Sequence, residues 1–227
     1  MPSQTAPSWA TPSPDPHPLQ PYATAAEQQA AAQLGMWIFL ATEAMFFGGA
    51  LTAYGVYRFR WPAAFGQASR ELDLWLGTLN TAVLLTSSLT MALAVAAAHA
   101  ARRGRTLAML CGTTMLGMVF LAIKFSEYLH KYHEQLWPVL GLPFAWQGTE
   151  PGAAQLFFTH YLALTGIHAL HMVIGLALLL IFIVRLTWRR EIATLAASVE
   201  VLGLYWHFVD LVWIFLFPLL YLIDRAP

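Results

Sequence analysis

The sequence contains one cysteine, Cys111, and few charged residues. A single cysteine excludes an intrachain disulfide, a CxxCH haem attachment and a metal centre built from paired thiolates. Charged residues make up 11% of the 227 residues, about half of the fraction usual in soluble domains. The formal net charge is zero and no basic block is present, so nothing in the sequence supports nucleic-acid binding.

Lys and Arg are absent from the first 33 residues, where proline and alanine are frequent. A secretory signal needs a positively charged start and then an apolar core, and this segment has neither. We therefore expect residues 1–33 to form a flexible Pro- and Ala-rich tail that could dock onto a partner. Helix formation could begin before the end of this tail, from Ala23 onward.

Long hydrophobic runs dominate the rest of the chain. Crossing a bilayer takes about 20 mainly apolar residues. Five stretches meet this requirement: Leu34–Tyr57, Leu74–Ala101, Leu107–Tyr128, Leu156–Leu186 and Val201–Ile223. We predict an all-α fold, a polytopic membrane bundle of five transmembrane helices formed by residues 34–227. The longest connection, between the third and fourth stretches, should form a small structured cap.

Glu43 lies about ten residues into the first stretch, and hence near mid-membrane at about 1.5 Å per residue. An ionisable residue at this depth is costly, and its default interpretation is functional. No Lys, Arg or His lies one turn away on the same helix, so a partner must come from another helix or from water. Two interpretations stay open for Glu43, a proton-handling group and a hydrogen-bond donor to a neighbouring helix.

Three histidines fall in the fourth stretch, two of them in the segment LTGIHALHMVIG at residues 164–175. His160 and His171 are three helical turns apart and share a face, and His168 lies about 60° to one side. Hydrogen bonding between helices by neutral imidazoles is one interpretation. Ligation of a metal or haem is another, although no second His-rich helix completes a coordination set.

Two further polar groups lie in or near the hydrophobic stretches. Glu200, His207 and Asp210 follow one face of the last stretch, where the i, i+3 spacing of His207 and Asp210 would let them satisfy each other. Lys124 and Glu127 have the same spacing near a membrane boundary and should form a structural, self-neutralising pair.

The sequence has no GxSxG elbow, no Walker loop and no dinucleotide fingerprint. An intramembrane hydrolase is therefore disfavoured. The residues by themselves suggest an accessory subunit, and they leave open a free-standing proton-coupled transporter and an isolated b-type haem protein.

Five segments together resemble one family. In chain order they are ATEAMFFGG, LNTAVLLTSS, FSEY, LTGIHALHMVIG and LYWHFVDLVWIFLF, spread from residue 41 to residue 217. This set resembles subunit III of the haem-copper respiratory oxidases, most closely cytochrome c oxidase subunit III, over residues 30–225. Many members have seven helices, and this chain is similar to the shorter bacterial form that lacks the first pair.

The resemblance implies an accessory, non-catalytic role. In this family subunit III binds no haem or copper and packs beside subunit I, which reduces oxygen to water and pumps protons. It supports proton uptake, protects subunit I from turnover inactivation, and holds phospholipids in a V-shaped cleft. The implied location is the bacterial inner membrane, with subunits I and II as partners. The identity of the electron donor, cytochrome c or quinol, stays open. A related accessory protein of nitric oxide reductase is a further alternative for this chain.

The resemblance also implies roles for single residues. Glu43 matches a buried carboxylate that reacts with carbodiimides, and Arg185 matches an arginine that contacts lipid headgroups. Intramembrane polar positions of the family are matched by His168, His171, His207 and Asp210. No catalytic residue and no metal ligand is implied in this chain.

These interpretations combine into one structural expectation. His168 and His171 should join the fourth and fifth membrane helices through hydrogen bonds to the polar stripe of Glu200, His207 and Asp210. On this hypothesis the histidines are structural donors and not metal ligands.

Overall fold

The computed structural model describes residues 24–138, 142–188 and 196–223. Over these residues it consists of six helices: α1 (Ala25–Arg60), α2 (Pro62–Arg70), α3 (Leu74–His99), α4 (Arg103–His133), α5 (Pro151–Trp188) and α6 (Ala196–Tyr221). All except α2 are long and apolar enough to cross a membrane, which confirms the predicted all-α fold with five transmembrane helices. Residues 1–23 of the expected tail lie outside the described residues, and residues 25–33 belong to α1.

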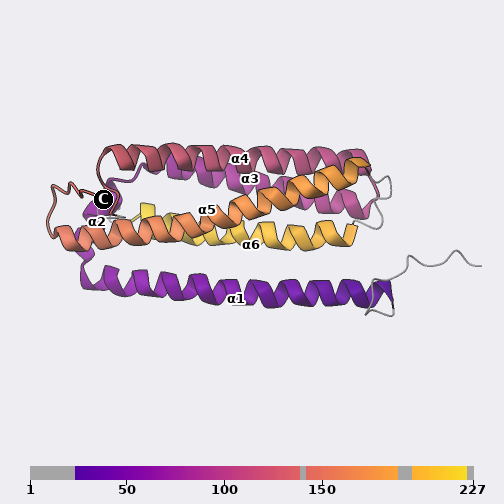
Figure 1. Cartoon of the computed structure of the whole chain (residues 1–227), viewed down its shortest axis with the longest axis horizontal. Coiled ribbons are helices and arrows are strands. Elements are labelled where there is room, and N and C mark those ends of the chain that lie inside the picture. Colours follow the sequence, from indigo (N-terminus) through magenta and orange to yellow (C-terminus); the bar gives the residue numbers. More distant parts are fainter. Residues whose placement is uncertain (1–23, 139–141, 189–195, 224–227) are drawn as a thin grey trace, which may run out of the picture.

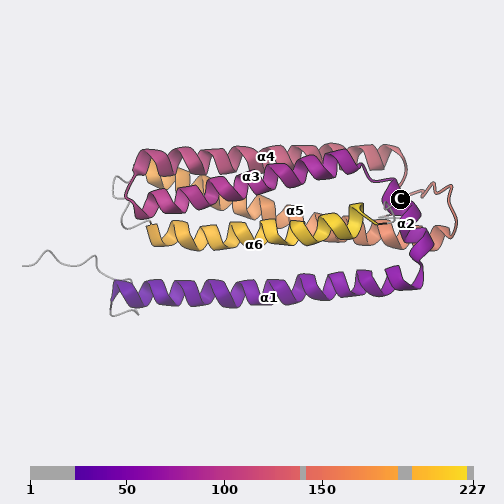
Figure 2. The same ribbon diagram turned by 180° about the vertical axis from the view of Figure 1, so that it is seen from behind.

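The five long helices lie side by side along one axis, with α2 at one end of the bundle (Figure 1). We call this end the α2 end; α1, α4 and α6 finish there, and α3 and α5 begin there. The central helix is α6, which packs against α1, α3 and α5. By contrast, α1 is peripheral (Figure 2), and none of its described Cα atoms lies within 8 Å of a Cα atom of α3 or α4.

Short polar signals in the sequence set where the helices begin. Thr24 precedes α1, and its hydroxyl accepts a hydrogen bond from the backbone N–H of Glu27 at 3.1 Å. Asp73 plays the same role for α3, where its carboxylate accepts from Trp75 and Leu76. Arg103 donates to the terminal carbonyl oxygens of Leu186 and Thr187, which caps the end of α5 with a positive charge.

Helix α2 was not anticipated from the sequence, because its nine residues are too few to show a clear period. Pro62 stands at its start, where the missing N–H of proline costs nothing. One face of α2 is fully buried, with Phe65 against the ring of Tyr54 at 5.5 Å. Ser69 donates to the carbonyl oxygen of Leu220 at 2.7 Å, so α2 closes the bundle over the end of α6.

Glycines allow one large side chain to fill the centre of the bundle. Trp206 of α6 is fully buried, and it lies against Gly117 of α4 and Gly175 of α5. A Cβ atom at Gly117 would come within 2.8 Å of the Trp206 ring, and one at Gly175 within 3.0 Å. The indole N–H donates to Ser87 of α3 at 3.1 Å. Trp206 therefore joins four helices at one level of the membrane.

Candidate functional site

Glu43 of α1 and His171 of α5 meet near the middle of the bundle. The Oε2 atom of Glu43 lies 3.1 Å from Nε2 of His171. The partner of Glu43 thus comes from another helix. The two side chains are 20% and 13% exposed, so the pair lies at the edge of the packed region and can be approached from outside it. Phe47 covers the His171 ring at a centroid distance of 5.5 Å.

The second ring nitrogen of His171 fixes how protons are arranged in this pair. Nδ1 lies 2.9 Å from the carbonyl oxygen of Ile167, and because a carbonyl can only accept, Nδ1 must carry a proton. One further proton is then shared between Nε2 and the Glu43 carboxyl. Whether it sits on Glu43 or on His171, the pair as a whole stays neutral, which limits the cost of placing it in a membrane.

His160 and His168 do not take part in this contact. His160 bonds to the carbonyl oxygen of Leu156 on its own helix at 2.8 Å. His168 is 1% exposed, and neither of its ring nitrogens has a hydrogen-bond partner among the described residues. Its ring packs against Phe120 and Trp213 at centroid distances of 5.5 and 5.2 Å.

The expected stripe of Glu200, His207 and Asp210 does not form a connected network. Glu200 accepts from Gln33 of α1 and lies 3.3 Å from Nε2 of His99, at the end opposite α2. His207 bonds through Nδ1 to the Ser88 hydroxyl of α3 at 2.7 Å. Neither carboxylate oxygen of Asp210 makes a well-formed hydrogen bond in the described part of the chain, although the Ser88 hydroxyl lies close enough to interact with this carboxyl.

Two predictions about these residues are therefore wrong. His168 and His171 do not bond to the stripe, because His171 turns toward α1 and His168 is enclosed by aromatic rings. His207 and Asp210 do not satisfy each other. The i, i+3 spacing permits that contact, but the α3 hydroxyl of Ser88 lies closer to the imidazole and takes its Nδ1.

Lys124 and Glu127 of α4 form an ion pair with 3.0 Å between Nζ and Oε2, and both are about 2% exposed. Tyr161 of α5 and Tyr221 of α6 complete the group. Each hydroxyl donates to Oε1 of Glu127, at 2.7 and 2.6 Å, and each accepts from Nζ of Lys124, at 3.1 and 2.8 Å. We call these four residues the aromatic clasp.

The aromatic clasp satisfies all of its charged atoms without help from outside the chain. The ammonium group of Lys124 makes three hydrogen bonds, which is the full number it can donate. Four aromatic rings surround it at 4.9 to 5.5 Å, and their negative faces add to the stabilisation. The clasp holds α4, α5 and α6 together near the α2 end.

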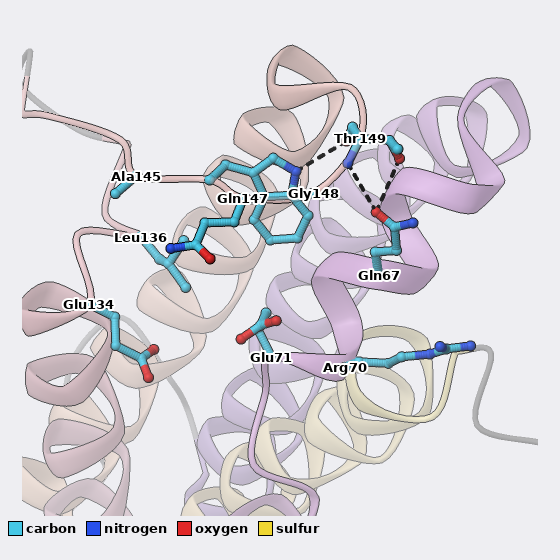
Figure 3. Close-up of a pocket in the computed structure, with 10 residues that line it drawn as sticks. Gln67, Arg70, Glu71, Glu134, Leu136, Ala145, Gln147, Gly148 and Thr149 are labelled. Carbon is cyan, nitrogen blue, oxygen red and sulfur yellow. Dashed lines mark hydrogen bonds between the residues drawn. The ribbon is translucent and has the colours of Figure 1, made fainter.

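Two pockets lie near opposite ends of the bundle. The first, of about 520 Å³, is lined by Arg185 together with Leu180, Ile181, Val184 and Trp188, all exposed on the last turns of α5. The second, of about 720 Å³, lies at the α2 end (Figure 3).

The walls of the second pocket connect the α4–α5 loop to α2. The Oε1 atom of Gln67 accepts from the backbone N–H and the hydroxyl of Thr149, at 3.3 and 3.1 Å (Figure 3). The carboxylates of Glu71 and Glu134 lie on its other sides. Trp146 in the loop packs against Phe158 at 6.2 Å, so the described part of the loop forms a cap over the bundle.

In the described ranges, no three His, Cys, Asp or Glu side chains lie close enough together to hold a metal ion. Several residues that shape these sites had not been singled out from the sequence, namely Ser88, Tyr161, Tyr205 and Tyr221. Tyrosines near the ends of apolar runs resemble membrane-interface anchors, which concealed the buried roles of Tyr161 and Tyr221.

Comparison with known proteins identifies the family. A sequence model described as cytochrome c oxidase subunit III matches residues 19–224, nearly the whole chain. The chain belongs to the cytochrome c oxidase subunit III family. It is 34% identical to cytochrome c oxidase subunit 3 of Synechocystis, over 83% of this chain and 74% of that protein. It is 29% identical to the cytochrome bo(3) ubiquinol oxidase subunit 3 of Pseudomonas aeruginosa, over 83% of each chain.

A third relative differs in its organisation. The chain is 31% identical to a protein of Aeropyrum pernix named haem-copper oxidase subunit I+III, over 83% of this chain and 22% of that protein. Membership of the subunit III family makes this chain a multi-pass membrane subunit of a haem-copper terminal oxidase, whose metals sit in other subunits.

Proposed function

We propose that this subunit III is an accessory subunit of a proton-pumping respiratory oxidase that reduces oxygen to water. It stabilises subunit I, supports proton uptake and binds phospholipids, while haem and copper are held by partner subunits. Subunits I and II are its partners, and the bacterial inner membrane is its location. The observation that carries this proposal is the pair of Glu43 and His171.

This pair has the properties of a proton-exchanging group. One proton bridges Glu43 and His171, the pair is neutral whichever of the two holds that proton, and the pair is partly open at the edge of the bundle. A group of this kind can give a proton to a neighbouring subunit and take one up again: release leaves one negative charge on the pair, and uptake restores its neutrality. Tyr205 donates to the carbonyl oxygen of His171 at 2.9 Å, which fixes this turn of α5 against α6.

The pocket beside Arg185 supports the lipid part of the proposal. A guanidinium group at a helix end binds phosphate oxygens through two parallel hydrogen bonds. The exposed apolar side chains of Leu180, Ile181 and Val184 continue from it toward the membrane interior. An anionic headgroup with its acyl chain fits this combination of one cation and an apolar surface.

Purification through a tag on this chain in mild detergent tests the proposal. We expect haem absorption bands and a large partner subunit to accompany the chain. The relatives include both a cytochrome c oxidase and a ubiquinol oxidase subunit, so the sequence of the co-purified copper-binding subunit would name the electron donor. A colourless, solitary chain would contradict the proposal and favour a transporter instead.

The substitution Glu43→Gln tests the proton-exchanging role directly. A glutamine amide can still donate to Nε2 of His171, so the complex should assemble with an unchanged haem content. It cannot release a proton, so proton-linked turnover should fall and labelling by a hydrophobic carbodiimide should be lost. Glu200→Gln is the matched control, because Glu200 lies at the end of the bundle and bonds to Gln33 and His99. Labelling that survives in the Glu43 variant would assign the reactive carboxyl elsewhere.

A further inference from the structure

The outer face of α6 between α3 and α1 is not covered by any of the residues that the structure describes. Five residues follow this face at alternating spacings of three and four: Leu204, His207, Leu211, Ile214 and Pro218. Leu211, Ile214 and Pro218 are exposed, and Leu204 and His207 are half-buried. Figure 2 shows α6 running between α3 and α1 in this direction. We call these five residues the open stripe.

The spacing of the open stripe is that of a helix seam. Positions repeating at intervals of three and four residues stay on one side of a helix and pack into the spaces of a neighbouring helix. On α3, a parallel row of exposed side chains has the same spacing: Thr78, Ala82, Leu85, Leu89, Ala92 and Ala96. Small and leucine side chains alternate in this row, which permits close approach of a further helix.

A polar group at mid-membrane depth distinguishes this face from a lipid-facing one. His207 lies in the middle of α6, and its Nδ1 is bonded to Ser88, but the described residues offer no partner to its Nε2. Asp210, one turn further, is 3% exposed and lies close enough to interact with the Ser88 hydroxyl, so the unpartnered outward-facing atom of this face is Nε2 of His207. A polar atom that faces hydrocarbon without a hydrogen bond is strongly disfavoured.

Exposed Thr and Ser side chains elsewhere on the membrane helices have hydroxyl groups that are hydrogen-bonded within the chain. Six of these Thr and Ser hydroxyls bond to a carbonyl oxygen of their own helix, three or four residues earlier: Thr42, Thr52, Thr86, Ser126, Thr159 and Thr187. These side chains need nothing from outside. The Nε2 atom of His207 has no such arrangement, which indicates that its partner belongs to another protein.

We infer that the open stripe is the docking face for a transmembrane helix of the catalytic subunit, and that this helix presents a hydrogen-bonding side chain to His207. The inference rests on the proposed function, which supplies subunit I as the neighbour. A polar side chain from a protein helix can form a hydrogen bond with Nε2 of His207, whereas a lipid acyl chain cannot. The apolar members of the stripe supply the flanking contacts.

A pair of matched substitutions tests the location of this face. Leu211 on the stripe and Met118 on the outer side of α4 are 50% and 52% exposed, and both lie in the middle of their helices. Leu211→Trp should lower the haem recovered per tagged chain by about tenfold, because a bulky ring disrupts close helix packing. Met118→Trp should leave haem recovery unchanged. Thermal unfolding of the purified chains shows whether either variant has lost its own fold.

The outcomes separate this inference from the function on which it rests. Loss of haem with the Met118 variant and not with the Leu211 variant would overturn the docking face and leave the oxidase role intact. Equal recovery from both variants would also overturn it. No haem with the unmodified chain would contradict the proposed function itself.

A photoreactive benzophenone side chain at Leu211 gives a second readout if Leu211→Trp misfolds. We expect it to crosslink to the haem-bearing subunit, while the same group at Met118 does not. Crosslinks from Leu211 to lipid alone would overturn the inference.

Discussion

The aromatic clasp and the open stripe both place ionisable side chains within a membrane bundle, but the clasp is enclosed and the stripe is exposed on one face. In the clasp, Lys124 and Glu127 are nearly inaccessible, and two tyrosine hydroxyls satisfy both charges. In the stripe, His207 has one nitrogen without a partner, and the neighbouring Asp210 has neither of its oxygens in a well-formed hydrogen bond within the described residues. The clasp is completed within the described residues, whereas the outward-facing Nε2 of His207 has no partner there. The fully buried His168 and Asn80 also lack hydrogen-bond partners in the described part of the chain, so access from outside is what distinguishes His207.

The largest effect should follow from breaking the clasp on one side. Lys124→Met removes the cation and leaves the Glu127 carboxylate buried without a counter-charge. We expect a loss of about 3–5 kcal/mol in the free energy of unfolding, measured on the isolated chain in detergent.

The double variant Lys124→Met with Glu127→Leu serves as the control for this change. It removes both charges together, so it should recover much of the lost stability. A single variant as stable as the unmodified chain would show that the clasp is not what joins α4, α5 and α6.

A smaller effect tests whether packing at Trp206 is as rigid as the clasp. Gly117→Ala places a Cβ atom 2.8 Å from the Trp206 ring, which is held between Gly117, Gly175 and Ser87 and cannot move away. We expect a loss of about 1–3 kcal/mol in the free energy of unfolding. In the control Gly49→Ala, the new methyl group meets nothing within 4 Å. That change should be neutral or slightly stabilising, since alanine favours a helix by about 1 kcal/mol over glycine. Equal melting temperatures for the two variants would argue for a deformable centre.

The hydrophobic runs were sufficient to predict five membrane helices, because length and apolarity are properties of each segment alone. The ends of the helices were less predictable. The apolar run itself begins only at Leu34, but the expectation that helix formation could start from Ala23 agrees with α1, which begins at Ala25 after the Thr24 cap. The contact of Lys124 with Glu127 could be predicted from their spacing on one helix.

The partners across helices could not be predicted, because they depend on how each helix is rotated about its axis. Glu43 was expected to find a partner on another helix or in water, but nothing in the sequence favoured His171 over His207 or Lys124. The structure pairs it with His171 because α1 packs against α5 and α6 and not against α3 or α4. Spacing alone suggested a hydrogen bond between His207 and Asp210. In the structure the imidazole of His207 bonds instead to the hydroxyl of Ser88 on α3.

The smallest expected change in the free energy of unfolding comes from a substitution next to the open stripe, and it tests directly how the stripe differs from the aromatic clasp. Asp210→Asn replaces a buried carboxyl, for which the Ser88 hydroxyl is an interacting neighbour, with a neutral side chain of the same shape that can still bond to a hydroxyl. The free energy of unfolding of the isolated chain should therefore change by no more than about 1 kcal/mol, the contribution of one ordinary hydrogen bond.

Glu127→Gln is the matched change in the clasp, and it should be strongly destabilising because it leaves Lys124 charged and buried without its counter-ion. In the assembled oxidase, Asp210→Asn should matter only if the docked helix bonds to this carboxyl. Equal destabilisation of the isolated chain by the two variants would mean that Asp210 is already satisfied within the subunit. In that case His207 would be the one residue at the open stripe whose hydrogen bonding is incomplete within the described residues.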